Sequence, residues 1–328
     1  MRDGKRNFIG DPRAATPTKT IMLRALAVSF AMLAVGVGPC AAQSKPPTIA
    51  IRTDTSSAVA NQLPTPNSNS AAGAASNEDS AAENELLEAA NKSRELAGVP
   101  PLRIEESLRQ AARAHALRMV ASERLEHQLP GEPSLLERIA QVTPPDSPSQ
   151  NALKVDRAGE NIANASCALG ANDVLMFSAP HRQNLLDHGF NVAGIAAIWS
   201  KGRLYVVQDF AHELPSYSTE QSGRLVARAV DDIRQQADLP ELEQLTPPNL
   251  DEAACSLARE NRPNAHLLST AYSNRKIIAY TESHPETLPP GALRLVRDPS
   301  VRQFAVGSCY ARNAAYPTGM YWVAILLY

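Results

Sequence analysis

The chain has 328 residues, of which 44% are hydrophobic and 20% are charged, and its formal net charge is −2. This length suits one large core or two modest ones, and the apolar content excludes a chain that is disordered throughout. The near-neutral charge excludes a broad basic surface, so we expect no nucleic-acid partner.

The longest apolar stretch lies near the N-terminus, from Ala25 to Gly38. Its length is typical of the apolar region of a signal peptide and is short for a membrane span. Small residues follow directly, so residues 1–42 are predicted to be a cleavable signal peptide, with Met22 as an alternative start. We therefore expect a secreted or periplasmic protein whose mature chain has no transmembrane helix. Lipoprotein anchoring through Cys40 is the weaker alternative.

Residues 43–82 are rich in Pro, Ser, Thr, Asn and Ala, a composition that predicts a disordered linker. Regular structure is expected to begin near Ser80, where apolar residues recur at helical spacing as far as Gly98. A second helix is predicted from Glu105 to Glu123, because its apolar residues also follow the helical period.

The next segments change from helix to strand. Residues 141–157 are polar and rich in proline, which indicates a surface excursion, and residues 173–186 favour a short helix broken near Pro180. Two β-rich runs, 192–199 and 204–210, flank a turn and predict a hairpin. Helices followed by a hairpin predict an α+β domain, which we place at residues 83–213.

Residues 220–328 repeat this plan in shorter form. Helices are expected at 224–236 and 250–261, and strands at 304–310 and 321–327, with Gly307 standing where Gly194 stands in the first domain. We therefore predict a reduced, degenerate second copy that lacks the site of the first. A small unrelated α+β domain is the alternative.

Loss of the signal peptide leaves three cysteines in an oxidising compartment, Cys167, Cys255 and Cys309. Cys255 and Cys309 lie in the same domain and are predicted to form a disulfide, which leaves one cysteine over. Three buried thiols are the alternative.

Three side chains of the first domain carry the chemistry. His127 follows the second helix, Glu160 lies in a Gly-Glu-Asn-Ile motif and His181 lies in a Ser-x-x-His motif that starts at Ser178. Two imidazoles and one carboxylate match the ligand set of an open zinc site. A metal-free cleft in which Glu160 hydrogen-bonds one histidine is the equal alternative. A hydrolytic triad of Ser178, His181 and Glu160 is a weaker alternative, since no Gly-x-Ser-x-Gly motif presents the serine.

Taken in order, these motifs resemble those of the CAP superfamily (cysteine-rich secretory proteins, antigen 5 and pathogenesis-related proteins) in its bacterial secreted branch. Further matching elements are Asn91-x-x-Arg94, Ala112-x-x-His115-Ala and Val207-Gln-x-Phe210. The resemblance implies an α-β-α sandwich with an open cleft over residues 83–213.

The resemblance also implies which residues face the cleft: His127, Asn161, Glu160, Ser178 and His181, with Ser178 standing where the family has a second acid. It implies a secreted module that binds a lipid, glycan or peptide, with zinc or another divalent metal as an optional cofactor. A metal-assisted hydrolase that uses the same cleft is the alternative function, and a structural envelope-interaction protein is the second alternative. No residue is assigned a catalytic role.

Overall fold

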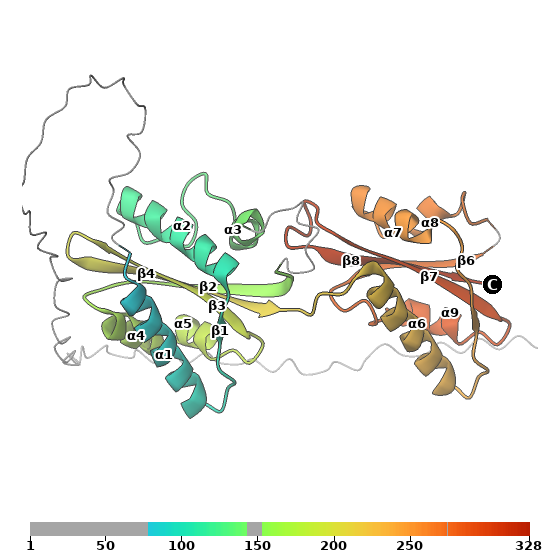
Figure 1. Ribbon diagram of the computed structural model, residues 1–328, viewed down its shortest axis with the longest axis horizontal. Coiled ribbons are helices and arrows are strands. Elements are labelled where there is room, and N and C mark those ends of the chain that lie inside the picture. The colour runs from blue at the N-terminus through green and yellow to red at the C-terminus, as the bar shows by residue number, and fades with distance from the viewer. Residues whose placement is uncertain (1–77, 143–152, 274) are drawn as a thin grey trace, which may run out of the picture. The chain divides into compact units, whose positions relative to one another are not determined.

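The computed structural model describes residues 78–142, 153–273 and 275–328, which form two four-stranded sheets with helices on both faces of each (Figure 1). We name residues 78–213 the first lobe and residues 219–328 the second lobe. The predicted signal peptide, Cys40 and most of the predicted linker lie outside the described residues. The described helices include none long and apolar enough to cross a membrane.

The sheet of the first lobe has the long strand β2 at one edge. The strand order is β1-β3-β4-β2, in which β1 and β3 are parallel and the other neighbours are antiparallel. The strands are β1 (Arg103–Ile104), β2 (Val155–Ala165), β3 (Val192–Ser200) and β4 (Arg203–Glu213). The long strand β2 is therefore paired on one side only.

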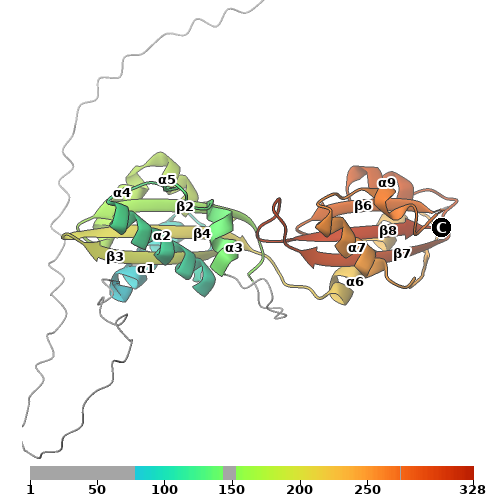
Figure 2. The same ribbon diagram turned by 90° about the horizontal axis from the view of Figure 1, so that it is seen from above.

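Helices cover both faces of this sheet, as the predicted α+β layers require (Figures 1 and 2). One face carries α1 (Ser80–Leu96), α4 (Ala168–Phe177) and α5 (Ala179–Leu185), and the other carries α2 (Glu106–Ser122) and α3 (Leu135–Val142). The core forms two layers because successive residues of a strand point to opposite faces. On β4, Val206 packs in one layer and Val207 in the other.

Local signals explain where the predicted elements begin and end. The Asp79 side chain caps α1 by accepting from the Ala82 amide at 2.9 Å, so the helix already begins inside the predicted linker. The predicted hairpin is β3 and β4. Its turn residues Lys201 and Gly202 have φ of 50° and 75°, as a type I′ turn requires.

One expectation is confirmed and another needs correction. The helix expected at 173–186 is broken near Pro180 as predicted, because the chain turns at Ser178 and places Pro180 in the first turn of α5, where its missing N–H is tolerated. The excursion expected at 141–157 is shorter at both ends, since α3 runs to Val142 and β2 begins at Val155.

The second lobe has the same strand order and the same strand directions, β5-β7-β8-β6. Its strands are β5 (Glu243–Gln244), β6 (Lys276–Glu282), β7 (Gln303–Ala311) and β8 (Met320–Leu327). Its helices are α6 (Thr219–Gln235), α7 (Leu250–Arg259), α8 (Ala265–Leu268) and α9 (Pro290–Val296). The segments predicted as helix and strand are found as such, whereas β5, β6, α8 and α9 were not predicted.

Backbone details recur in the two lobes. A Cβ built on Gly194 would stand 2.1 Å from the Leu108 carbonyl carbon of α2, and one built on Gly307 would stand 2.4 Å from the Leu250 oxygen of α7. Each glycine therefore lets a helix approach its sheet closely.

Two arginines recur in the same way. Arg94 and Arg234 are buried, and each donates from Nε to a proline carbonyl six residues ahead, Pro100 and Pro240. Each guanidinium also donates to two carbonyls at the end of a short helix, those of Leu185 and Asp187 in the first lobe and of Val296 and Asp298 in the second.

The cysteines of the described residues are disulfide-bonded. Cys255 on α7 and Cys309 on β7 form the predicted pair, with their Cα atoms 5.1 Å apart. Cys167 is also disulfide-bonded, so it is not left over as a thiol, and its sulfur accepts from the Gly170 amide at the start of α4.

Candidate functional site

The predicted site residues gather at the free edge of β2. Glu160 and Asn161 are successive residues of this strand, so their side chains point to opposite faces of the sheet. Glu160 faces α2 and α3, where it meets His127, and Asn161 faces α5, where it bonds the His181 carbonyl. One histidine therefore comes from each helical layer.

His127 lies in the connection between α2 and α3. Its Nδ1 lies 2.9 Å from Oε1 of Glu160, and its side chain is 55% exposed whereas that of Glu160 is 5% exposed. Arg138 of α3 donates to the other Glu160 oxygen and, at 3.0 Å, to the His127 carbonyl. Arg138 thus fixes both the carboxylate and the backbone that carries the histidine.

A second acid and histidine lie behind this group. Nδ1 of His115 lies 2.9 Å from both oxygens of Glu132, and both side chains are fully buried. Nε2 of His115 lies 3.8 Å from Glu160, and Arg138 lies 3.9 Å from Glu132. Although burial opposes it, the hydrogen bonds from His115 and the Leu129 amide hold the pKa of Glu132 below its usual value.

Asp209 of β4 lies beside Glu160 and is the last buried acid of this cluster. It stands directly opposite Glu160 in the strand register, is buried, and neither of its carboxyl oxygens has a hydrogen-bond partner among the described residues. Burial and the neighbouring charge of Glu160 raise its pKa well above the usual value. We call His115, Glu132, Arg138, Glu160 and Asp209 the charged network.

His181 stands in the first turn of α5, with its ring centroid 6.1 Å from that of His127. Its Nδ1 is buried without a hydrogen-bond partner among the described residues. Burial and the neighbouring His127 lower its pKa, which favours the neutral ring. The site therefore presents two imidazoles to the edge of the sheet, with the exposed one paired to an acid.

The triad alternative is not supported by these contacts. Glu160 bonds His127 and not His181, and the described residues show no hydrogen bond between Ser178 and His181. Ser178 precedes α5, and its side chain makes no capping bond to that helix.

The donor set also fits a metal poorly. Both oxygens of Glu160 are engaged, one by His127 and the other by Arg138, and a guanidinium beside the site repels a second cation. Within the described ranges, no three His, Cys, Asp or Glu side chains are grouped so that they could hold a metal ion. We therefore assign no step to a metal.

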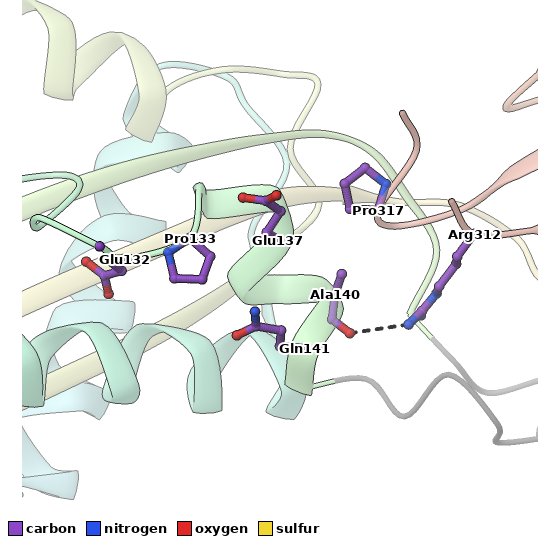
Figure 3. A pocket seen from close by; sticks show the side chains of 8 residues that line it. Glu132, Pro133, Glu137, Ala140, Gln141, Arg312 and Pro317 are labelled. Carbon is purple, nitrogen blue, oxygen red and sulfur yellow. Dashed lines mark hydrogen bonds between the residues drawn. The ribbon is translucent and has the colours of Figure 1, made fainter. Parts of the chain in front are cut away.

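A pocket of about 750 Å³ opens beside Glu132 (Figure 3). Arg312 reaches across it and donates to the Ala140 carbonyl at 3.3 Å. The pocket is lined by Gly131, Glu132, Pro133, Glu137, Ala140, Gln141, Arg312 and Pro317. The predicted site residues do not line this pocket, and of the charged network only Glu132 does.

Sequence reasoning missed most of the network. His115 was noted as part of a helix motif, whereas the structure shows it buried and bonded to Glu132. Arg138 and Asp209 were not singled out. The available signal for Asp209 was an acid in the middle of an apolar strand, which is rare unless the acid is paired or neutral.

Part of the first lobe matches the sequence model of a known protein family. The model of the cysteine-rich secretory protein family (CAP) matches residues 87–210. A comparison with curated proteins gives no match.

Several solved structures are similar to part of the chain. An extracellular SCP-domain protein from Bacillus anthracis is 22% identical over 40% of each chain, with a TM-score of 0.35. A cysteine-rich secretory protein from Staphylococcus aureus is 21% identical over 40% of this chain and 39% of its own, with a TM-score of 0.30. An outer surface protein from Borrelia burgdorferi is 14% identical over 42% of this chain and 99% of its own, with a TM-score of 0.37. This chain thus spans less than half the length of the Bacillus and Staphylococcus proteins.

Proposed function

Because residues 87–210 are a CAP domain, we propose that the edge of β2 which carries His127 and His181 binds a lipid, glycan or peptide, and that the protein is a binding module. The observation that supports this proposal is a comparison within the molecule. The first lobe buries charged groups at positions that the second lobe fills with apolar ones.

The strand register identifies these positions. In the first lobe Gly194, Asp209 and Glu160 lie in one row across β3, β4 and β2. The row that contains Gly307 in the second lobe consists of Gly307, Ala324 and Ala279. The helices match in the same way, since Gly194 lies against Leu108 of α2 and Gly307 lies against Leu250 of α7. Seven residues further along each helix stand His115 and Leu257, and both are fully buried.

The same strand order therefore forms without the charges. Replacing buried ion pairs by apolar residues of similar volume is often neutral or stabilising, because desolvation of the charges offsets their attraction. Stability of the fold does not explain why the first lobe keeps them. We infer that they hold His127 in place for a ligand.

The same contacts argue against Glu160 as a general base. A general base needs a free lone pair aimed at its substrate, but Glu160 is held from two sides by His127 and Arg138. Hydrolysis remains the competing proposal, and the experiment below separates the two.

Two further proposals accompany this one. The repeated strand order, glycine and arginine contacts support a second lobe that is a degenerate copy of the first. Export of the protein is supported by the apolar segment 25–38 and by the Cys255–Cys309 disulfide, since disulfides persist in oxidising compartments.

The binding proposal is tested on the full chain by NMR of its histidine rings. Phosphatidylglycerol vesicles, N-acetylglucosamine oligomers and a tryptic peptide mixture are added in turn, and mass spectrometry checks each sample for cleavage. We expect one probe to shift the signals of both His127 and His181 without forming product. Product formation would favour the hydrolase, and unchanged signals with all three probes would contradict the binding proposal.

Glu160→Gln should abolish the shift, because a neutral amide no longer holds the His127 imidazole as a carboxylate does. Glu83→Gln is the matched control, since Glu83 is a buried acid of the same lobe that pairs with Arg109 and Arg113 instead. An equal loss of binding in both variants would indicate a general effect on the fold.

A further inference from the structure

The structure points to a pair of asparagines that positions His181, an inference that takes its functional meaning from the proposed binding site. We propose that Asn161 and Asn184 hold the N-terminal turn of α5 against β2 and so set the place of His181 relative to His127. Both act through another residue and are positioning residues.

The hydrogen bonds of the two amides link the strand and the helix in both directions. Asn184 of α5 donates from Nδ2 to the Glu160 carbonyl and to Oδ1 of Asn161, each at 3.2 Å. Asn161 of β2 donates from Nδ2 to the His181 carbonyl at 3.0 Å. The backbones of Glu160 and His181, which carry an acid and a histidine of the site, are thus joined by two side chains.

The other described side-chain hydrogen bond at this end of α5 is that of Arg182, which donates to the Met176 carbonyl of α4 at 3.1 Å. The helix has seven residues, and Leu185 is its buried residue. Arg94 holds the other end, through the carbonyl of Leu185. Since Nδ1 of the His181 ring has no hydrogen-bond partner among the described residues, the position of the ring follows from that of its backbone.

The second lobe shows that the fold does not require these amides. Tyr280 occupies the strand position that follows Ala279, as Asn161 follows Glu160. Its hydroxyl donates to the Pro285 carbonyl before α9. The asparagine pair therefore occurs in the lobe that carries the two facing histidines.

The test uses Asn184→Leu in the full chain, because leucine fills a similar volume without hydrogen bonds. Asn91→Leu is the matched control. Asn91 also joins a helix to a distant backbone, with bonds of 3.0 and 2.7 Å to Leu102, but it has no contact with the site. Histidine ring signals are recorded without any ligand.

We expect Asn184→Leu to shift the ring signals of His181 and to remove the nuclear Overhauser contact between the two histidine rings. Asn91→Leu should leave both unchanged. Unaltered His181 signals in a folded Asn184→Leu protein would overturn the positioning role.

A measurement on the wild type covers the case in which the variant does not fold. The side-chain amide protons of Asn161 and Asn184 should exchange slowly with solvent, and fast exchange of both would also overturn the proposal. These readouts need no ligand. If Asn184→Leu displaces His181 and the protein still binds its probe, the binding proposal fails while the positioning role stands.

Discussion

At the scale of single residues, Arg138 joins the two halves of the charged network. It bonds Glu160 and the His127 carbonyl, and it lies 3.9 Å from Glu132. Removal of one member of a buried ionic group leaves the others without a partner, which costs about 3–5 kcal/mol. We therefore expect Arg138→Met to lower the free energy of unfolding by about this amount, measured by urea denaturation.

Arg118→Met is the control for this prediction. Arg118 also lies 3.9 Å from Glu132, but its side chain is 57% exposed, so its loss should change the stability by less than about 0.5 kcal/mol. Equal losses in the two variants would contradict the role given to Arg138.

Asp209 makes the stability of the protein depend on pH. Glu160 from β2, Arg138 from α3 and Glu132 from the connecting loop act on its carboxyl group, and burial followed by the charge of Glu160 raises its pKa. The folded protein therefore keeps a proton that the unfolded chain releases above pH ~4. Stability contributed by this group is present below that pH and falls, by about 1.4 kcal/mol per unit, as the pH rises toward the folded-state value.

Asp209→Asn is neutral in both states and should remove that slope. Unfolding of the two proteins is compared between pH 5 and 8, and the difference between the curves isolates Asp209 from the other titrating groups. Parallel curves would show that Asp209 is ionised in the folded protein.

Zinc affinity tests the poor fit of the donor set. Because Arg138 holds Glu160, we expect calorimetric titration of zinc into the full chain to show no saturable site that depends on the two histidines. One zinc per chain in the wild type, lost in His127→Ala/His181→Ala, would restore the metal alternative.

At the scale of elements, the approach of each helix to its sheet depends on a glycine. In Gly194→Ala the new methyl group would stand 2.1 Å from the backbone of α2, so the helix must move. We expect a loss of about 3 kcal/mol in the free energy of unfolding. Gly223→Ala in α6 is the control, because a Cβ at this position would meet nothing within 4 Å. This change should raise the free energy of unfolding by about 0.5–1 kcal/mol, since alanine is more favourable than glycine inside a helix. Similar effects of the two changes would contradict this reading of the packing.

Element prediction succeeded where the pattern is local. The helical spacing in α1 and α2 and the turn chemistry at Lys201-Gly202 lie within a few residues, and these elements are found. Strand β2 was missed, because an edge strand that carries Glu160 and Asn161 lacks the apolar alternation of a core strand.

The site residues, like the elements, were predictable where they stand in short sequence motifs. His127, Glu160 and His181 stand in short motifs, and the fold brings all three to one edge. Their partners Arg138 and Asp209 come from separate segments and carry no motif. Only the strand register and the packing of α3 place them beside Glu160.

At the scale of the whole molecule, each lobe carries its own reporter. The chain has two tryptophans, Trp199 on β3 and Trp322 on β8. The Cys255–Cys309 disulfide closes a loop of 54 residues, which corresponds to about 4 kcal/mol of stabilisation. Cys255→Ala/Cys309→Ala should therefore lower the unfolding transition of Trp322 and leave that of Trp199 in place. Equal shifts of both transitions would show that the lobes unfold as one unit.

The most direct test of the central claim, that the charged network serves a ligand and not the fold, replaces all of its members together so that no charge is left unpaired. The variant is His115→Leu/Glu132→Gln/Arg138→Leu/Glu160→Ala/Asp209→Ala, in which the changes at His115, Glu160 and Asp209 introduce the residue types found at the matching positions of the second lobe, Leu257, Ala279 and Ala324. Urea unfolding and the histidine ring shifts with the bound probe are measured on the same sample. We predict a folded protein with an unfolding midpoint at or above that of the wild type and no ring shifts. A variant that fails to fold, or one that folds and still binds the probe as the wild type does, would contradict the account.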